Sequence, residues 1–229
     1  MEKKITLKKI KNFSRISFLV IFLLICFSTK VLAENNAAGK SAKNITKALN
    51  KAYKKVETIS ALFTQETYNK ALNQRDLSSG KIFLKRGGKL RWEFITPVED
   101  VLISNGKKFW VYQDDLAQVI LTSVEAGPQG AAIRFLTGEV DFQRDFTSEL
   151  LQVDGDSYTL SLLPKTPLGS IKTLIIEVGK KDYLIKQSII EDTMGITTTV
   201  GLSDIKTNLK IKDSFFEFIP PKGVKVVRP

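Results

Sequence analysis

The feature that most restricts the fold of this chain is a close succession of short, strand-like segments. From residue 59 to residue 205, segments rich in aromatic and β-branched residues are separated mostly by a few turn residues. Asn105-Gly106 is a strong two-residue hairpin signal, and Gly87-Gly88 joins another pair of segments. Parallel strands need long crossover connections, usually helices, and the pattern offers no such helices between successive strands. The sequence therefore predicts one mainly β domain, built as a large antiparallel meander.

The predicted strands number about eleven, and no internal repeat or linker divides them. They span residues 59–69, 78–86, 89–95, 98–105, 107–113, 116–122, 149–154, 158–163, 171–178, 184–191 and 196–205.

Two segments are predicted to be helical instead. Apolar residues recur at three- and four-residue spacing, with lysines on the other face, at Ile45, Leu49, Ala52 and Val56. Ser41 is the expected N-cap of this amphipathic helix of about four turns. A short apolar helix is expected at Ala131–Leu136, ending before Gly138. Two helices of this size are enough to cover part of a wide sheet but too small to fill its concave side.

The strand patterns also predict which faces are buried. Residues 89–95 place Leu90, Trp92 and Phe94 on one face and charged residues on the other. Residues 109–112, Phe109-Trp110-Val111-Tyr112, are apolar on both faces, which predicts cover on both sides of that strand. The pattern leaves two readings of the aromatic residues open. They form either an ordinary packed core or the lining of a cavity for a lipid or acyl chain.

Residues 1–33 have the organisation of a secretory signal peptide, which is removed from a mature protein. Basic residues dominate up to Arg15, an unbroken apolar run extends over Ile16–Phe27, and the segment ends at the small residue Ala33. The apolar run is shorter than the roughly 20 residues of a membrane span, which argues against a signal anchor. Ile25 before Cys26 is too large for a lipid-attachment site. We therefore expect an exported mature domain of residues 34–229.

The residue types that are missing exclude several classes of function. The chain has no histidine, and its one cysteine, Cys26, lies within the predicted signal peptide. Catalytic triads built on histidine, Cys–His nucleophiles and histidine- or cysteine-ligated zinc are therefore excluded. We expect no enzyme, no cofactor and no metal site. The predicted signal peptide holds seven of the 35 lysines and arginines and one of the 24 acids, so the net charge falls from +11 to +5 without it. Nucleic acid is not an expected partner.

Several segments in a fixed order carry a resemblance to one known family. They are Ser60-Ala61-Leu62-Phe63-Thr64-Gln65, Ser79-Gly80-Lys81-Ile82-Phe83-Leu84-Lys85-Arg86, Leu90-Arg91-Trp92-Glu93-Phe94 followed by Pro97, the segment 102–112, Leu116-Ala117-Gln118-Val119 and the segment 216–227. The ordered set is more specific than any single piece, and it extends from the first predicted helix to the C-terminus. The chain resembles the LolA family, the periplasmic carriers of outer-membrane lipoproteins.

The resemblance implies a single unclosed antiparallel β-barrel with a helical lid over an apolar cavity for lipoprotein acyl chains. It implies a carrier in the periplasm, which we expect to be a monomer. An inner-membrane ABC-type lipoprotein release complex would load it, and an outer-membrane receptor lipoprotein would accept its cargo. Two alternatives stay open, namely a carrier of another apolar ligand, such as a glycolipid or fatty acid, and an envelope-stress sensing domain on the same fold.

The resemblance also implies roles for single residues. Arg86 takes the position of an arginine that holds the lid shut through hydrogen bonds to lid carbonyls. The residues implied for the acyl-chain cavity and its mouth are Leu90, Trp92, Phe94, Trp110, Ile133, Phe135 and Leu136. The family usually has proline after this arginine, whereas this chain has Gly87-Gly88, which predicts a looser turn beside the lid.

Overall fold

The computed structural model describes residues 41–125 and 129–228. The predicted signal peptide, residues 1–33, lies outside the described residues. Within the described ranges, each helix is too short or too polar to cross a membrane. The residues from Ala42 onward form one compact unit.

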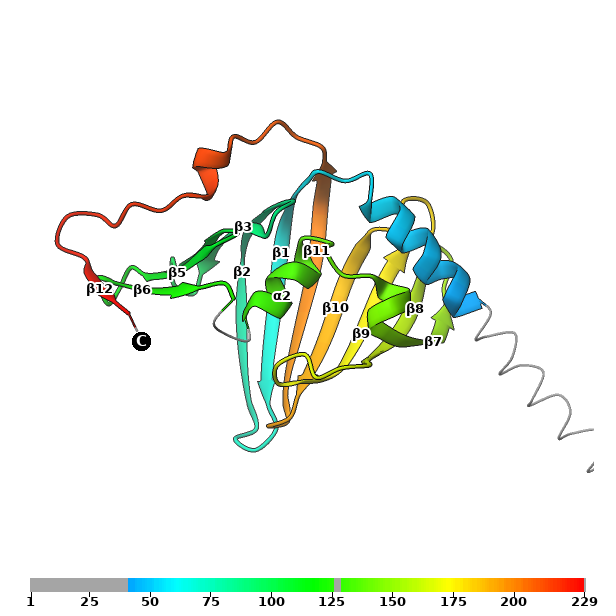
Figure 1. Cartoon of the computed structure of the whole chain (residues 1–229). Helices are drawn as coiled ribbons and strands as arrows, with labels where there is room; N and C mark the ends of the chain where they lie inside the picture. The colour runs from blue at the N-terminus through cyan, green and yellow to red at the C-terminus, as the bar shows by residue number, and fades with distance from the viewer. Residues whose placement is uncertain (1–40, 126–128, 229) are drawn as a thin grey trace, which may run out of the picture. The chain divides into compact units, whose positions relative to one another are not determined.

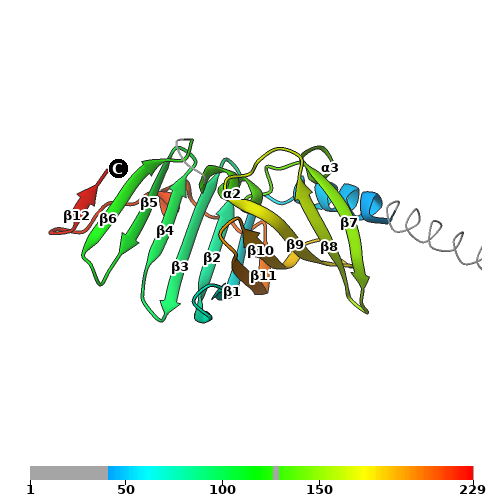
Figure 2. The same cartoon turned by 90° about the horizontal axis from the view of Figure 1, so that it is seen from below.

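The described residues form one open sheet of twelve strands, in the order β12-β6-β5-β4-β3-β2-β1-β11-β10-β9-β8-β7 (Figures 1 and 2). The strands are β1 (Thr58–Asn69), β2 (Gln74–Lys85), β3 (Lys89–Thr96), β4 (Val101–Asn105), β5 (Lys108–Gln113), β6 (Gln118–Ser123), β7 (Phe146–Val153), β8 (Ser157–Pro164), β9 (Ile171–Gly179), β10 (Ile185–Asp192), β11 (Ile196–Thr207) and β12 (Lys225–Val227). The predicted class, a mainly β unclosed sheet with few helices, is confirmed. The strand number is corrected from about eleven to twelve, and the last strand, β12, pairs parallel with β6 rather than antiparallel.

The hairpin at the centre of the sheet is longer than its sequence pattern predicts. β1 and β2 pair along their whole lengths, from Thr58 opposite Lys85 to Asn69 opposite Gln74. The first four residues of β2 are all exposed, so they lack the alternation that marks a strand in a sequence. Backbone pairing with β1 satisfies their N–H and C=O groups and extends the strand.

In the described ranges, three helices pack on the sheet: the helix of residues 41–53, α2 (Gln129–Leu136) and α3 (Phe142–Asp145). Each contributes buried side chains to the main apolar cluster. The sequence pattern missed α3, because four residues are too few to show a helical period. Asp141 caps α3, and its Oδ1 accepts hydrogen bonds from the backbone N–H groups of Gln143 (2.9 Å) and Arg144 (3.0 Å).

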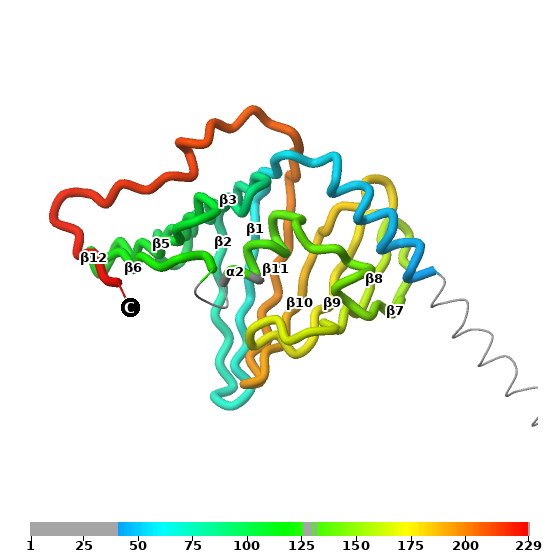
Figure 3. Tube along the Cα trace, viewed as in Figure 1, coloured from blue at the N-terminus to red at the C-terminus, as the bar shows by residue number. Residues whose placement is uncertain are grey.

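The buried apolar residues form two clusters, which lie on opposite faces of β5. Phe109 belongs to the main cluster, whereas its neighbour Trp110 belongs to the second one. The second cluster is covered by Phe218 and Val224 from the C-terminal segment, which runs from β11 through a 3-10 turn (Asp213–Phe216) to β12 (Figure 3). The prediction that this strand is covered on both sides is therefore confirmed.

Candidate functional site

An apolar cavity lies between the sheet and the helices, where α2 passes over β1, β2 and β11 (Figure 1). Its lining residues are Tyr53, Ile59, Ile82, Leu84, Trp92, Phe135, Leu136, Leu184, Ile185, Ser188, Val200, Leu202 and Ile205. Its volume is about 30 Å³, which is room for a single water molecule and not for an acyl chain. The cavity is therefore too small for an acyl chain in this conformation, and a larger ligand requires rearrangement of its lining.

Trp92 of the cavity lining belongs to a group of three packed aromatic rings. The Phe63 ring lies 5.1 Å from the Trp92 ring at 71° and 5.2 Å from the Phe94 ring at 80°, both edge-to-face. Such pairs contribute about 0.5–1.5 kcal/mol each beyond their buried area, which stabilises the position of the Trp92 ring. The indole Nε1 of Trp92 is buried, and among the described residues no atom accepts a hydrogen bond from it.

A second group of aromatic side chains ties the helices to one another. The Phe142 ring of α3 lies 6.2 Å from the Tyr53 ring and 5.9 Å from the Phe135 ring. The Tyr53 hydroxyl accepts a hydrogen bond from the backbone N–H of Ile185 (3.3 Å). Burial raises the pKa of the Tyr53 phenol to about 12, so it stays neutral. The roof of the cavity is therefore apolar and uncharged, and it moves against the sheet only when these packing contacts change.

Arg86, at the end of β2, joins the sheet to the first helix. Its Nε donates to the backbone oxygen of Val56 (2.9 Å), and its Nη2 donates to that of Tyr53 (2.6 Å). The Tyr53 carbonyl belongs to the last residue of the helix 41–53 and also accepts a hydrogen bond from the Val56 N–H (3.1 Å), whereas the Val56 carbonyl lies three residues beyond the helix. A cation is also favoured at that end of a helix. Arg86 thus bonds to one carbonyl of the first helix and to one of the segment that follows it, and its role in holding a lid shut stays a prediction.

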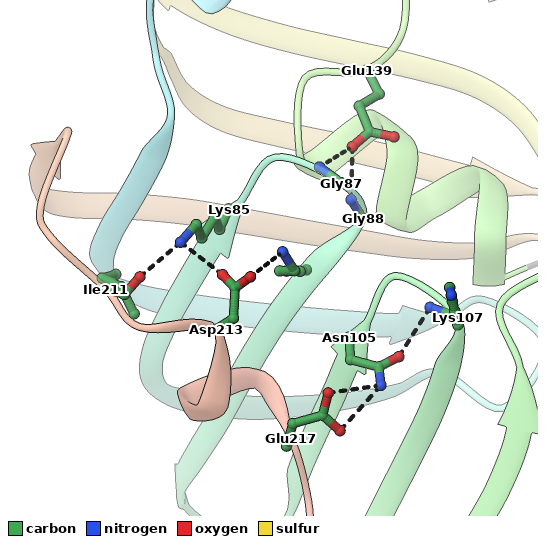
Figure 4. A network of polar contacts seen from close by, with 10 residues as sticks. Lys85, Gly87, Gly88, Asn105, Lys107, Glu139, Ile211, Asp213 and Glu217 are labelled. Atoms are coloured by element: carbon green, nitrogen blue, oxygen red, sulfur yellow. Dashed lines mark hydrogen bonds and ion pairs between the residues drawn. The ribbon is translucent and has the colours of Figure 1, made fainter.

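The turn after Arg86 is held by a carboxylate from the segment that follows α2. One oxygen of Glu139 accepts hydrogen bonds from the backbone N–H groups of Gly87 and Gly88, both at 2.7 Å (Figure 4). The two glycines have φ angles of +81° and +67°. Proline is fixed near −65° and has no N–H, so it could not take the place of Gly87 in this contact. The expected looser turn is therefore not what the structure shows.

The C-terminal segment is fastened beside the same turn. Asp213 pairs with Lys85 (2.8 Å) and Lys89 (2.9 Å), and Lys85 also donates to the Ile211 carbonyl (Figure 4). Hydrogen bonds from these two lysines lower the pKa of the Asp213 carboxyl below its ordinary value. These contacts hold the start of the segment that covers the second cluster.

One known protein family matches this chain over most of the architecture described above. The family described as "Outer membrane lipoprotein carrier protein LolA" matches residues 54–219, from the end of the first helix to the segment that covers the second cluster. The chain belongs to the LolA family. This is a family of carrier proteins and not of enzymes.

Individual LolA relatives match over most of their lengths. An outer-membrane lipoprotein carrier protein of Legionella pneumophila (strain Corby) is 31% identical over 212 residues, which is 92% of this chain and 98% of that protein. One from Nitrosomonas europaea is 28% identical over 183 residues, or 80% of this chain and 88% of that protein. Among solved structures, an uncharacterized conserved protein from Thermus thermophilus matches with a TM-score of 0.53 and 15% identity, covering 82% of this chain and 99% of that one. The structural match supports the fold.

The residues that the LolA resemblance suggested fall into three places. Trp92, Phe135 and Leu136 line the cavity. Leu90 and Ile133 are buried in the main cluster, and Phe94 packs against it. The structure places Trp110 elsewhere, in the second cluster with Ile103 and Val119, because successive residues of a strand point to opposite faces.

Sequence reasoning missed several residues of this LolA site. Most of the missed lining residues come from β1, β2, β10 and β11, whose alternation marks a buried face but not a cavity. Tyr53 lies one helical turn after Leu49, on the same apolar stripe of the helix. The helical spacing of that stripe is therefore a signal that predicts Tyr53 to face the sheet. Glu139 carries no local signal, since its partners lie more than 50 residues earlier in the chain.

Proposed function

We propose that this chain is a periplasmic carrier that holds the acyl chains of lipoproteins in the cavity under its helices. The observation that carries the proposal is the closed apolar cavity, whose lining is almost wholly aliphatic and aromatic. The polar contacts that fasten its cover, from Arg86 and Glu139, lie outside that lining. A site that binds apolar cargo and keeps its polar fastenings apart suits a carrier with a movable lid.

The energetics of acyl burial explain why a closed cavity suits this task. Transfer of a methylene group out of water gains about 0.8 kcal/mol, so a chain of about 16 carbons gains on the order of 12 kcal/mol. A permanently open pocket with that affinity would release its cargo too slowly. When the empty protein is mostly closed, the apparent affinity falls by the fraction of molecules that are open. Lid closure thus sets the affinity low enough for delivery.

Arg86 is the residue to which we assign the holding of the closed state. Its guanidinium bridges the end of β2 to a carbonyl of the first helix and to one of the segment that follows it. Bound cargo would lift the helices, break both bonds and expose further apolar residues of the main cluster. We expect Leu90, Phe94 and Ile133 to be among those that then line the enlarged cavity.

The family assignment supports a place for this carrier between two membranes. Residues 1–33 would direct export and be removed, leaving residues 34–229 in the periplasm. An inner-membrane ABC-type release complex would supply the acylated protein, and an outer-membrane receptor lipoprotein would accept it. The chain needs no catalytic group for either step, since both are exchanges of a bound apolar group.

Mass spectrometry of material bound to the mature protein tests this function. The full chain would be produced in a bacterium with an outer membrane, purified from the periplasm, and its non-covalently bound material extracted. We expect a mature N-terminus at Glu34 and bound diacyl- or triacyl-peptides, in larger amounts on Arg86→Leu than on the wild type. Arg75→Leu, at the distant β1–β2 hairpin, is the matched control and should behave as the wild type. Free fatty acid, glycolipid or no bound lipid on all three proteins would contradict the assignment.

A further inference from the structure

Three residues of the otherwise apolar cavity lining carry a polar group. They are Trp92 with its indole N–H, and Tyr53 and Ser188 with their hydroxyl groups. A cavity that bound only hydrocarbon would gain nothing from such groups, and each one costs free energy if it is buried without a partner. Their presence therefore suggests that part of the bound ligand is itself polar.

The Trp92 indole is the clearest of the three. The side chain is 9% exposed, and no acceptor for its Nε1–H exists among the residues that the structure describes. The rings around it, Phe63 and Phe94, carry no nitrogen or oxygen atom that could accept a hydrogen bond. An unmet buried donor costs about 1–3 kcal/mol, whereas a phenylalanine at this position would fill the space without that cost. An incoming acceptor would recover this free energy.

The other two groups belong to lining residues of the first helix and of β10. Ser188 of β10 is 7% exposed, and no residue in the described ranges forms a hydrogen bond with its hydroxyl group. The Tyr53 hydroxyl accepts from the Ile185 N–H, so its own proton is still available for donation. All three groups can therefore donate, and no carboxylate or cationic side chain is part of the lining.

We propose that the cavity recognises the carbonyl oxygens of acyl esters, and that Trp92 donates the main hydrogen bond to them. The inference rests on the proposed function, because it takes an acyl ligand in this cavity as given. A carbonyl oxygen is an acceptor without a proton, which matches a wall that offers donors and no charge. Burying the carbonyl beside Trp92 satisfies both groups at once. The site then prefers an acyl ester to a hydrocarbon chain of the same length.

Two probes that differ only in their carbonyl groups test the proposal. They are 1,2-dihexanoylglycerol, a diester, and 1,2-dihexylglycerol, the diether with the same number of chain carbons. Calorimetric titration of the mature wild-type protein should show the diester binding about three- to tenfold more tightly, as one hydrogen bond predicts. Trp92→Phe keeps an aromatic ring and removes the N–H, so it should bind both probes about equally. Trp110→Phe, in the second cluster, is the control and should keep the preference of the wild type.

A spectroscopic measurement keeps the proposal testable if Trp92→Phe does not fold. In the Trp110→Phe protein, Trp92 is the one remaining tryptophan. Its emission should move to longer wavelength with the diester and not with the diether. If Trp92→Phe keeps the diester preference, or if the emission responds equally to both probes, the inference is overturned. If neither probe binds the wild type or Arg86→Leu, the acyl cavity itself is refuted. That outcome differs from equal binding of both probes to the wild type, which refutes only the role of Trp92.

Discussion

Removal of the Arg86 guanidinium should open the cavity measurably. Arg86→Leu loses the bonds to the carbonyls of Val56 and Tyr53, at 2.9 Å and 2.6 Å. Hydrogen bonds from charged donors contribute about 1.5–3 kcal/mol each. The Arg86 side chain is 39% exposed, so water replaces part of this when the bonds break. We therefore take about 2 kcal/mol for the pair, which shifts the balance between closed and open forms about thirtyfold.

Binding of a fluorescent apolar probe, such as anilinonaphthalene sulfonate, measures this shift. If most wild-type molecules are closed, Arg86→Leu should bind the probe up to about thirtyfold more tightly, because more of the protein is competent to bind. Arg75→Leu removes a comparable exposed arginine that pairs with Glu66 and should bind as the wild type does. Both proteins must give the circular dichroism spectrum of the wild type. Wild-type probe affinity in a folded Arg86→Leu protein would refute the reasoning.

Three other changes test separate parts of the cover. Glu139→Ala should raise probe affinity about three- to tenfold, because the turn loses two hydrogen bonds. Glu139→Gln should raise probe affinity less. Wild-type probe affinity in both variants would contradict a role for Glu139 in closing the cavity. Asp141→Ala should lower the free energy of unfolding in urea by about 1 kcal/mol through loss of the α3 cap, and an equal loss in Asp141→Ser would argue against capping. The pKa of Asp213 is lowered in the folded protein, so its lysine contacts are complete above about pH 4 and are lost as pH falls through that lowered value. Protection of amides in the C-terminal segment, measured against the intrinsic exchange rate at each pH, should fall over that range in the wild type and be low at all pH values in Asp213→Asn.

Local patterns predicted most of the sheet. Asn105-Gly106 forms the β4–β5 turn, and the apolar run that includes Phe109 and Trp110 is buried on both faces as its composition predicts. These features depend on neighbouring residues, which a sequence displays directly. β12 could not be predicted in the same way, because its three residues pair with Gln118–Ile120, about a hundred positions earlier.

The candidate site was predicted less completely than the fold. Alternation identified Trp92 as an inward-facing residue, but it could not decide that Trp110 faces the second cluster instead of the cavity. β5 is apolar on both faces, so its pattern does not say which face meets the helices, and the difference lies in what covers each face. The helices cover one face and the C-terminal segment covers the other, and such long-range packing leaves no periodic signal.

The Gly87-Gly88 turn ties the end of β2 to the segment after α2 without a proline after Arg86. Both glycines adopt φ values that a proline cannot reach, and both of their N–H groups bind Glu139. The cover is thus fastened at two points on one hairpin end, with Arg86 holding the first helix and the turn holding the segment after α2. The Arg86 and Glu139 side chains are not among the lining residues, so under the proposed function a substitution of either should change how often the cavity opens more than it changes the apolar lining. The proposed function thus predicts that affinity and release are adjusted by separate residues.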